Sequence, residues 1–206
     1  MTDASMTGER ATASADISVH HSRAELGTPT RSGFAVAWGR WYEWVDAHPI
    51  GAIALVGFIA TQMGTYFGYV FPAVGLPVLP WPLYNGVLAS PAEPFGSAAS
   101  FFTGQSLHFL NGIVFAILYA AFVRPSLPLP DTHSGNIAKG LVYGVAMTII
   151  SIGVLVPYAY VPDQGYGFFS FSGPDGWKLP AGVLVWHLIY GFMLGTLYQP
   201  SDRSPR

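Results

Sequence analysis

Four stretches of the chain are apolar and contain no charged residue. They cover residues 50–71, 99–123, 140–160 and 180–199. At 1.5 Å per residue, a helix over the first stretch is about 33 Å long, enough to cross the hydrocarbon core of a bilayer. The pattern therefore predicts an all-α membrane protein built as a bundle of four transmembrane helices.

A polar tail and an amphipathic segment precede the first apolar stretch. Residues 1–32 are rich in Ser, Thr and Ala with scattered charges, so we expect a disordered tail. Residues 33–48 combine charged side chains with three tryptophans, Trp38, Trp41 and Trp44. This composition is typical of a helix that lies in the membrane interface with its indole rings at headgroup depth.

The transmembrane domain is expected to occupy residues 49–200, with a second polar tail at residues 201–206. Six prolines separate the first two apolar stretches: Pro72, Pro77, Pro80, Pro82, Pro91 and Pro94. Because proline interrupts helices, we expect a proline-rich extramembrane loop before Gly96.

The basic residues predict an orientation. Eight of the 9 Lys and Arg residues flank one side of the four predicted spans: Arg10, Arg23, Arg31, Arg40, Arg124, Lys139, Arg203 and Arg206. Lys178 alone lies on the other side. Because cytoplasmic segments of membrane proteins are enriched in basic residues, both termini are predicted to be cytoplasmic, in a multi-pass protein of a cell's inner (plasma) membrane.

A pattern of one histidine, two small residues and one tyrosine occurs twice. Its members are His108, Gly112, Ala116 and Tyr119, and then His187, Gly191, Gly195 and Tyr198. At about 100° per residue, each copy forms one narrow stripe on a helix. A weaker repeat, Gly57 with Thr61 and Gly144 with Thr148, keeps the same order. Together they predict a duplicated helical hairpin whose two histidine stripes lie on parallel helices.

The first interpretation of the stripes is structural. In each stripe the small residues are four apart, the spacing that lets helix backbones approach closely in a membrane. Each histidine then hydrogen-bonds to a neighbouring helix or loop, and Tyr119 and Tyr198 anchor the helix ends in the membrane interface.

A second interpretation uses His108 and His187 as a pair of axial ligands for haem b, which makes the protein a membrane electron carrier. Against it, the predicted spans hold no Arg or Lys to pair with haem propionates. A copper or zinc site on the same two histidines lacks a third ligand from Cys, Asp or Glu inside the spans.

A third interpretation is a small proton-linked transporter or a channel that works as an oligomer. The predicted spans contain no Asp, Glu, Lys or Arg, so this interpretation relies on the histidines and uncharged polar groups.

Sequence motifs of soluble hydrolases, phosphate loops and dinucleotide sites do not occur, which favours a non-enzymatic protein.

Composition supports the membrane class: 51% of residues are hydrophobic and 10% are charged, against about 25% charged in ordinary soluble domains. The net charge of -2 offers no basic face for nucleic acid. The chain has no cysteine, which removes disulfides, thiolate metal sites and cysteine nucleophiles.

Three runs carry a resemblance to a known group. They are Gly-Phe-Ile-Ala-Thr-Gln-Met from Gly57, Leu-His-Phe-x-x-Gly around His108, and Trp-His-Leu-Ile-Tyr-Gly-Phe-Met-Leu-Gly-Thr-Leu-Tyr from Trp186. Over about residues 50–199 the chain resembles small bacterial four-span integral membrane proteins of unknown function. That resemblance implies an architecture but no activity, substrate or cofactor. We therefore expect a non-enzymatic subunit or accessory factor of an inner-membrane assembly, with the lipid bilayer and other membrane subunits or a second copy as partners.

Overall fold

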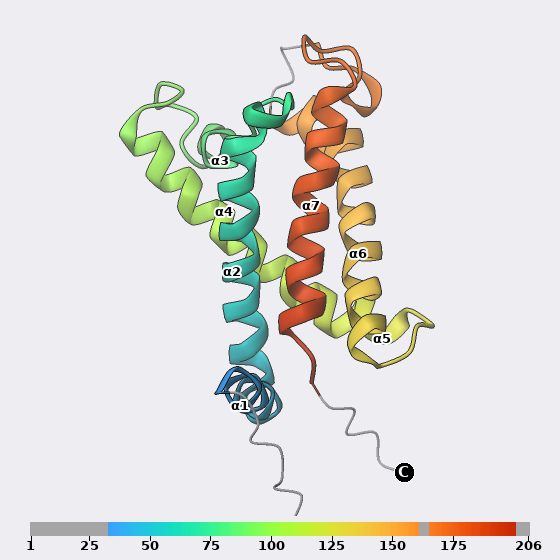
Figure 1. Cartoon of the computed structure of the whole chain (residues 1–206). Coiled ribbons are helices and arrows are strands. Elements are labelled where there is room, and N and C mark those ends of the chain that lie inside the picture. The colour runs from blue at the N-terminus through green and yellow to red at the C-terminus, as the bar shows by residue number, and fades with distance from the viewer. Residues whose placement is uncertain (1–32, 161–164, 201–206) are drawn as a thin grey trace, which may run out of the picture.

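The computed structural model describes residues 33–160 and 165–200, which fold into helices and loops with no strand among them (Figure 1). The elements are α1 Gly33–Ala47, α2 Pro49–Val70, η1 Phe71–Val74, α3 Trp81–Ala89, α4 Ala98–Leu118, η2 Tyr119–Val123, α5 Arg124–Ser126, α6 His133–Ile150, η3 Ser151–Tyr160, η5 Phe168–Ser170 and α7 Lys178–Leu197. Of the short elements, η2 and η3 are π-helical, whereas η1 and η5 are 3₁₀ turns. Both predicted polar tails, 1–32 and 201–206, lie outside the described residues.

Four continuous helical segments are long and apolar enough to cross a bilayer. They run over Pro49–Val74, Ala98–Ser126, His133–Tyr160 and Lys178–Leu197. The prediction of an all-α protein with four helices of transmembrane length is therefore confirmed. The second segment passes beyond residue 123, and the third begins before residue 140.

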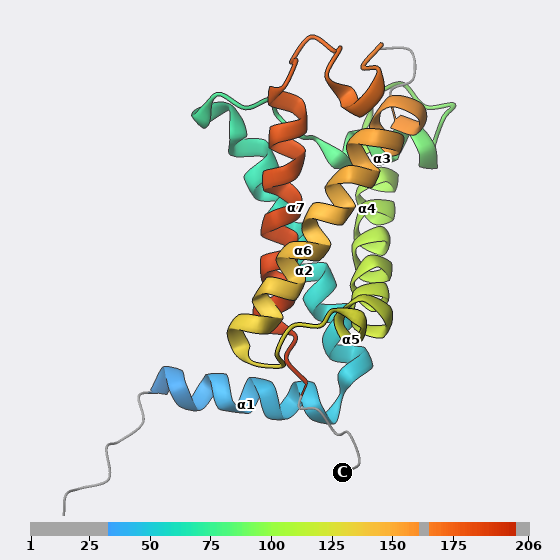
Figure 2. The ribbon, with the colours of Figure 1, turned by 90° about the vertical axis from the view of Figure 1, so that its right-hand side faces the viewer.

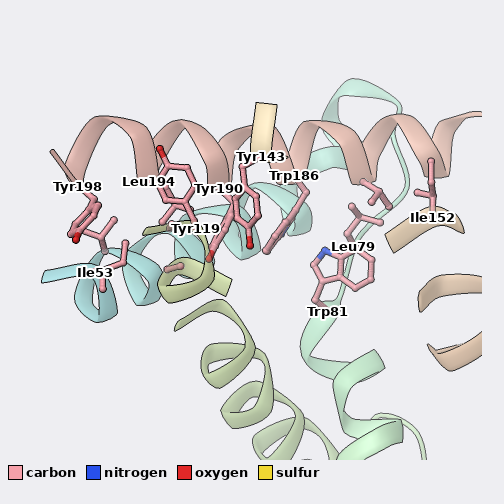
Figure 3. Close-up of a cluster of buried hydrophobic side chains, with 14 of the residues drawn as sticks. Ile53, Leu79, Trp81, Tyr119, Tyr143, Ile152, Trp186, Tyr190, Leu194 and Tyr198 are labelled. Atoms are coloured by element: carbon pink, nitrogen blue, oxygen red, sulfur yellow. The ribbon is translucent and has the colours of Figure 1, made fainter. Parts of the chain in front are cut away.

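The four segments pack as two hairpins joined through α2 and α7. α2 contacts both α4 and α7, and α6 packs along α7. α2 and α7 run side by side, whereas α1 lies across one end of the bundle (Figures 1 and 2). Aromatic residues fill the centre, with Tyr119, Tyr143, Tyr190 and Trp186 close to one another (Figure 3).

Glycine allows the close helix contacts inside each hairpin. A Cβ at Gly57 of α2 would lie 2.6 Å from the Cβ of Ala116 in α4. In the other hairpin, a Cβ at Gly140 or at Gly191 would meet the backbone carbonyl of the opposite glycine. Each histidine stripe therefore packs against the partner helix of its own hairpin, and the two stripes do not pack against each other.

The expected proline-rich loop contains a helix, which corrects that expectation. α3 packs along the first half of α4, where a Cβ at Gly104 would meet the carbonyl oxygen of Pro82. Its prolines lie at Pro80 and Pro82, the N-cap and the second helical residue. Proline is tolerated there because the first amides of a helix have no intrahelical acceptor, so these prolines start the helix and do not prevent it.

The helical segments extend past the predicted uncharged spans and include charged residues. Arg124 and Lys139 both lie inside the helical segments and are buried, at 8% and 2% exposure. The Lys139 Nζ lies 2.6 Å from Asp131 Oδ1, and an Arg124 guanidinium nitrogen lies 3.4 Å from the same oxygen. A shared carboxylate at the end of the bundle explains how two cations are accommodated there.

α1 is fastened to the end of α7. The indole Nε1 of Trp41 donates to the carbonyl oxygen of Leu197 at 2.8 Å, and the hydroxyl of Tyr42 donates to the carbonyl oxygen of Thr196 at 3.3 Å. Val45 of α1 is completely buried. The start and the end of the helical bundle therefore lie at the same end of the molecule.

Candidate functional site: a lateral groove between α4 and α6

A groove of about 350 Å³ lies between α4 and α6. Its walls come from both hairpins and from α3, and among the lining residues are His108, Asn111, Met147, Tyr160, His187 and Tyr190. We call this cavity the lateral groove. Its volume falls in the range typical of small-molecule sites, which are apolar with a few convergent polar groups.

The lateral groove opens on the side of the bundle. Three of its lining residues are large hydrophobic side chains on the outer surface: Leu118 is 38% exposed, Phe122 is 64% exposed and Ile150 is 56% exposed. They belong to two apolar helical segments of transmembrane length. In a bilayer, the rim of the groove therefore faces acyl chains.

Two π-helical segments shape the groove. Phe122 of η2 and both Leu155 and Tyr160 of η3 line it. η3 contains Pro157, which has no amide hydrogen to donate and so interrupts the backbone ladder. The hydroxyl of Ser170 donates to the carbonyl oxygen of Ile152 at 2.8 Å. This bond satisfies the carbonyl that lies five residues before Pro157, the acceptor of a π-helical bond.

Hydrogen bonds define the tautomer of His108 in its neutral form. Its Nε2 lies 3.0 Å from the hydroxyl of Thr65, which itself donates to the carbonyl oxygen of Thr61 at 2.8 Å. A threonine hydroxyl carries one hydrogen, so Nε2 is the donor in the contact with Thr65. The Nδ1 of His108 is therefore the nitrogen with a free lone pair.

His187 has the opposite tautomer. Its Nδ1 lies 2.9 Å from the carbonyl oxygen of Val183, which only accepts, so Nδ1 carries the hydrogen and Nε2 has the lone pair. Both imidazoles contact the same indole: the ring centroids of His108 and His187 lie 5.6 Å and 5.1 Å from that of Trp186. The structure thus brings both sequence-predicted histidines to one cavity. His108 is held by the hydrogen bond of its Nε2, and His187 by the hydrogen bond of its Nδ1.

Sequence reasoning missed the polar end of the groove, which α3 supplies. Trp81 and Asn85 both line it. The amide of Asn111 donates to Asn85 Oδ1 at 3.0 Å, and Asn85 donates to the carbonyl oxygen of Trp81 at 2.9 Å. Trp81 is 5% exposed, and its Nε1 has no hydrogen-bond partner. The Trp-Pro pair followed by Asn85 was the available signal, because it matches the first turn of a helix.

The residues present do not fit a bis-histidine haem. The Nε2 of His108 is hydrogen-bonded to Thr65. The Nδ1 of His108 is bonded to the ring carbon that carries Cβ, so the backbone of its own helix would obstruct a flat macrocycle bound at that nitrogen. Among the residues that the structure describes, no Arg or Lys lines the groove to meet propionates. Within 33–160 and 165–200 no three His, Cys, Asp or Glu residues cluster as a metal site.

A smaller cavity adjoins the polar end and is lined by Tyr84 and Tyr166, among others. Burial, together with Tyr166 and Asp175, raises the pKa of Tyr84 above its usual value. Burial and Asp175 likewise raise the pKa of Tyr166. Both phenols are therefore neutral at physiological pH and bring no charge to this end of the molecule.

The remaining predicted site residues lie as follows. Tyr119 is buried against Tyr143, with ring centroids 5.3 Å apart, and its hydroxyl donates to the carbonyl oxygen of Asn136. Tyr198 is also buried, at 7% exposure. Trp38, Trp41 and Trp44 lie half-buried on α1. That these five aromatic residues lie in a membrane interface stays a prediction.

Gly112, Ala116, Gly191 and Gly195 all lie in helix contacts.

Comparison of this chain with protein-family models, with curated proteins and with solved structures finds no match.

Proposed function

We propose that the protein is a non-enzymatic membrane subunit that takes an apolar small molecule from the bilayer into the lateral groove. One observation carries the proposal: an apolar cavity of about 350 Å³ has an exposed hydrophobic rim and two oriented imidazoles inside it. Apolar walls with a few oriented polar groups are the usual composition of small-molecule sites. The rim provides entry directly from the acyl-chain region.

In the orientation that we propose, the protein lies in a bacterial inner membrane with both of its termini in the cytoplasm. Arg40, Arg124 and Lys139 gather at the α1 end, whereas Lys178 begins α7 at the opposite end. This distribution follows the preference of cytoplasmic segments for basic residues.

We also propose that the bundle is a duplicated hairpin. In support, Thr61 donates to the carbonyl oxygen of Gly57 at 2.8 Å, and Thr148 donates to that of Gly144 at 2.9 Å. Equivalent helices thus carry the same local bond. As partners we propose the lipid bilayer and other membrane subunits or a second copy of this chain, as in a larger inner-membrane assembly.

Mass spectrometry of the solvent extract of mildly solubilised protein tests the binding function. Ala146→Trp places a large side chain in the groove wall, and Val145→Trp places the same side chain one residue away, on an exposed position outside the groove. We expect one apolar molecule per chain in the wild type and in Val145→Trp, and its loss in Ala146→Trp. No such molecule in the wild type, or equal amounts in both variants, would refute the proposal.

An absorbance spectrum of the same samples, oxidised and dithionite-reduced, decides the haem b alternative. Because His108 is engaged by Thr65, we expect no haem bands. Sharp reduced bands that disappear in His108→Ala or His187→Ala would replace the proposed function with that of a one-haem electron carrier.

A further inference from the structure

The polar atoms of the lateral groove define the head group of its occupant, an inference that rests on the proposed function. Among its atoms without a protein partner are the Nδ1 lone pair of His108, the Nε2 lone pair of His187 and the Nε1 hydrogen of Trp81. The first two are acceptors and the third is a donor. The Nε1 of Trp81 is buried, and buried polar groups are normally hydrogen-bonded, whereas the two imidazoles belong to residues that line the groove. This set points to a ligand that both donates and accepts.

The three groups lie around one indole. The ring centroids of His108, His187 and Trp81 lie 5.6, 5.1 and 6.2 Å from that of Trp186. Trp186 also has an unpartnered Nε1, but this atom faces Gly64 of α2, where a Cβ would lie 3.0 Å away. We therefore leave Trp186 out of the donor set and treat it as the surface on which the head group rests.

The uncharged lining of the groove further limits which head groups can bind there. Among the residues that the structure describes, no Asp, Glu, Lys or Arg lines the groove. The buried Arg124 and Lys139 pair with Asp131 at the α1 end. A carboxylate, phosphate or ammonium in the groove would be buried without a counter-charge, which is strongly unfavourable.

We propose that the occupant is a neutral apolar molecule with a hydroxyl head, an aliphatic or phenolic alcohol. Its O–H donates to an imidazole lone pair, and its oxygen accepts from the Trp81 indole. An ether or ketone satisfies the indole but leaves both imidazoles unpaired. A hydrocarbon satisfies neither, and a carboxylate adds an uncompensated charge. The hydroxyl is the smallest neutral group that serves both kinds of atom.

A series of ligands that share an unbranched twelve-carbon chain tests this inference on the full chain in detergent. Tritiated dodecan-1-ol is the bound probe in a scintillation proximity assay, and the competitors are dodecan-1-ol, methyl dodecyl ether, dodecanoate and dodecane. We expect the alcohol to compete about tenfold more tightly than the ether, the carboxylate or the hydrocarbon, the effect of one to two hydrogen bonds.

Two variants and two controls identify the atoms. Trp81→Phe and His187→Phe remove one donor and one acceptor, and each should weaken alcohol binding several-fold while leaving dodecane unchanged. Trp177→Phe and His133→Gln, at exposed positions outside the groove, should bind like the wild type. Because the ligand series is also measured on the wild type, a variant that fails to fold does not decide the outcome.

Equal competition by all four ligands, preference for dodecanoate, or no binding of the alcohol would overturn the hydroxyl assignment. Retention of one apolar molecule by the wild type, with its loss in Ala146→Trp, would in those cases still support the groove as a binding site. Absence of that molecule overturns the proposed function itself, so the two failures are distinguishable.

Discussion

The hydroxyl of Tyr190 in α7 donates a 2.6 Å hydrogen bond to the backbone carbonyl oxygen of Gly112 in α4. Tyr190 is 1% exposed and stacks on Trp186, with ring centroids 5.9 Å apart and planes 11° from parallel. Tyr190 and Gly112 belong to helices that pack mainly on other partners. Their bond therefore ties one hairpin to the other at the wall of the lateral groove.

Replacing Tyr190 with Phe removes this tie and keeps the ring. The carbonyl of Gly112 keeps its helical bond, so we expect a loss of about 1 kcal/mol in the free energy of unfolding, the usual worth of one such hydrogen bond. Thermal unfolding in detergent measures it. Tyr158→Phe, at a tyrosine that is 65% exposed, is the matched control. Equal stability of the two variants would contradict the role of this bond.

Gly191→Ala tests the close contact between α6 and α7. A Cβ there meets the backbone carbonyl of Gly140, which cannot move without separating α6 from α7. We expect a clear fall in the unfolding temperature, of a size set by overpacking, about 1–3 kcal/mol. Gly51→Ala lies in α2 with no atom within 4 Å of the added carbon, and it should be neutral or slightly stabilising because alanine favours helix. A neutral Gly191→Ala would show that the two helices are not in contact at this position.

Ser170→Ala tests the bond that completes the π-helical segment. Ser170 is completely buried with a positive φ of 59°, so the backbone around it is held in a conformation unusual for a residue with a side chain. Alanine keeps that φ but leaves the carbonyl of Ile152 without a donor, which we expect to destabilise the protein by about 1–2 kcal/mol. Faster amide exchange in η3 than in the exposed-site control Ser172→Ala is the local readout. Unchanged exchange would refute this assignment.

Asp131→Asn tests the charge cluster at the α1 end. The Lys139 side chain is 3% exposed, and the substitution leaves its ammonium buried beside Arg124 without the carboxylate between them. We expect destabilisation by about 2 kcal/mol, below the 3–5 kcal/mol of fully buried pairs because Asp131 is 43% exposed. The double variant Asp131→Asn with Lys139→Met should recover part of the loss. Glu93→Gln, on an exposed loop, should have no effect on the unfolding temperature.

The four spans were predictable because they depend on local properties of the sequence. An apolar run of sufficient length forms a helix and partitions into a bilayer whatever its neighbours are. The ends of the predicted spans were less accurate. Arg124 and Lys139 limit the predicted spans because they are charged, but both lie inside the helical segments, where they pair with Asp131. The carboxylate of Asp131 comes from the loop between them, and a hydropathy profile does not predict this pairing.

The candidate site was predictable only in part. His108 and His187 stand out in the sequence as polar residues in apolar spans, and the structure places both at the lateral groove. Trp81 and Asn85 did not stand out, because their segment was expected to be a loop. α3 is a helix of nine residues, too short to be stable alone in water, and it owes its conformation to packing against α4.

By itself, the sequence determined the class of protein, the number of apolar helices and the histidines to consider, because hydropathy and helical spacing act over neighbouring residues. Only the tertiary structure decided which helices pair, where the groove opens and which nitrogen of each imidazole is free. Those properties depend on contacts between residues far apart in the chain, such as Thr65 with His108 and Ser170 with Ile152. A pattern within one helix does not specify which atoms of another helix it will meet.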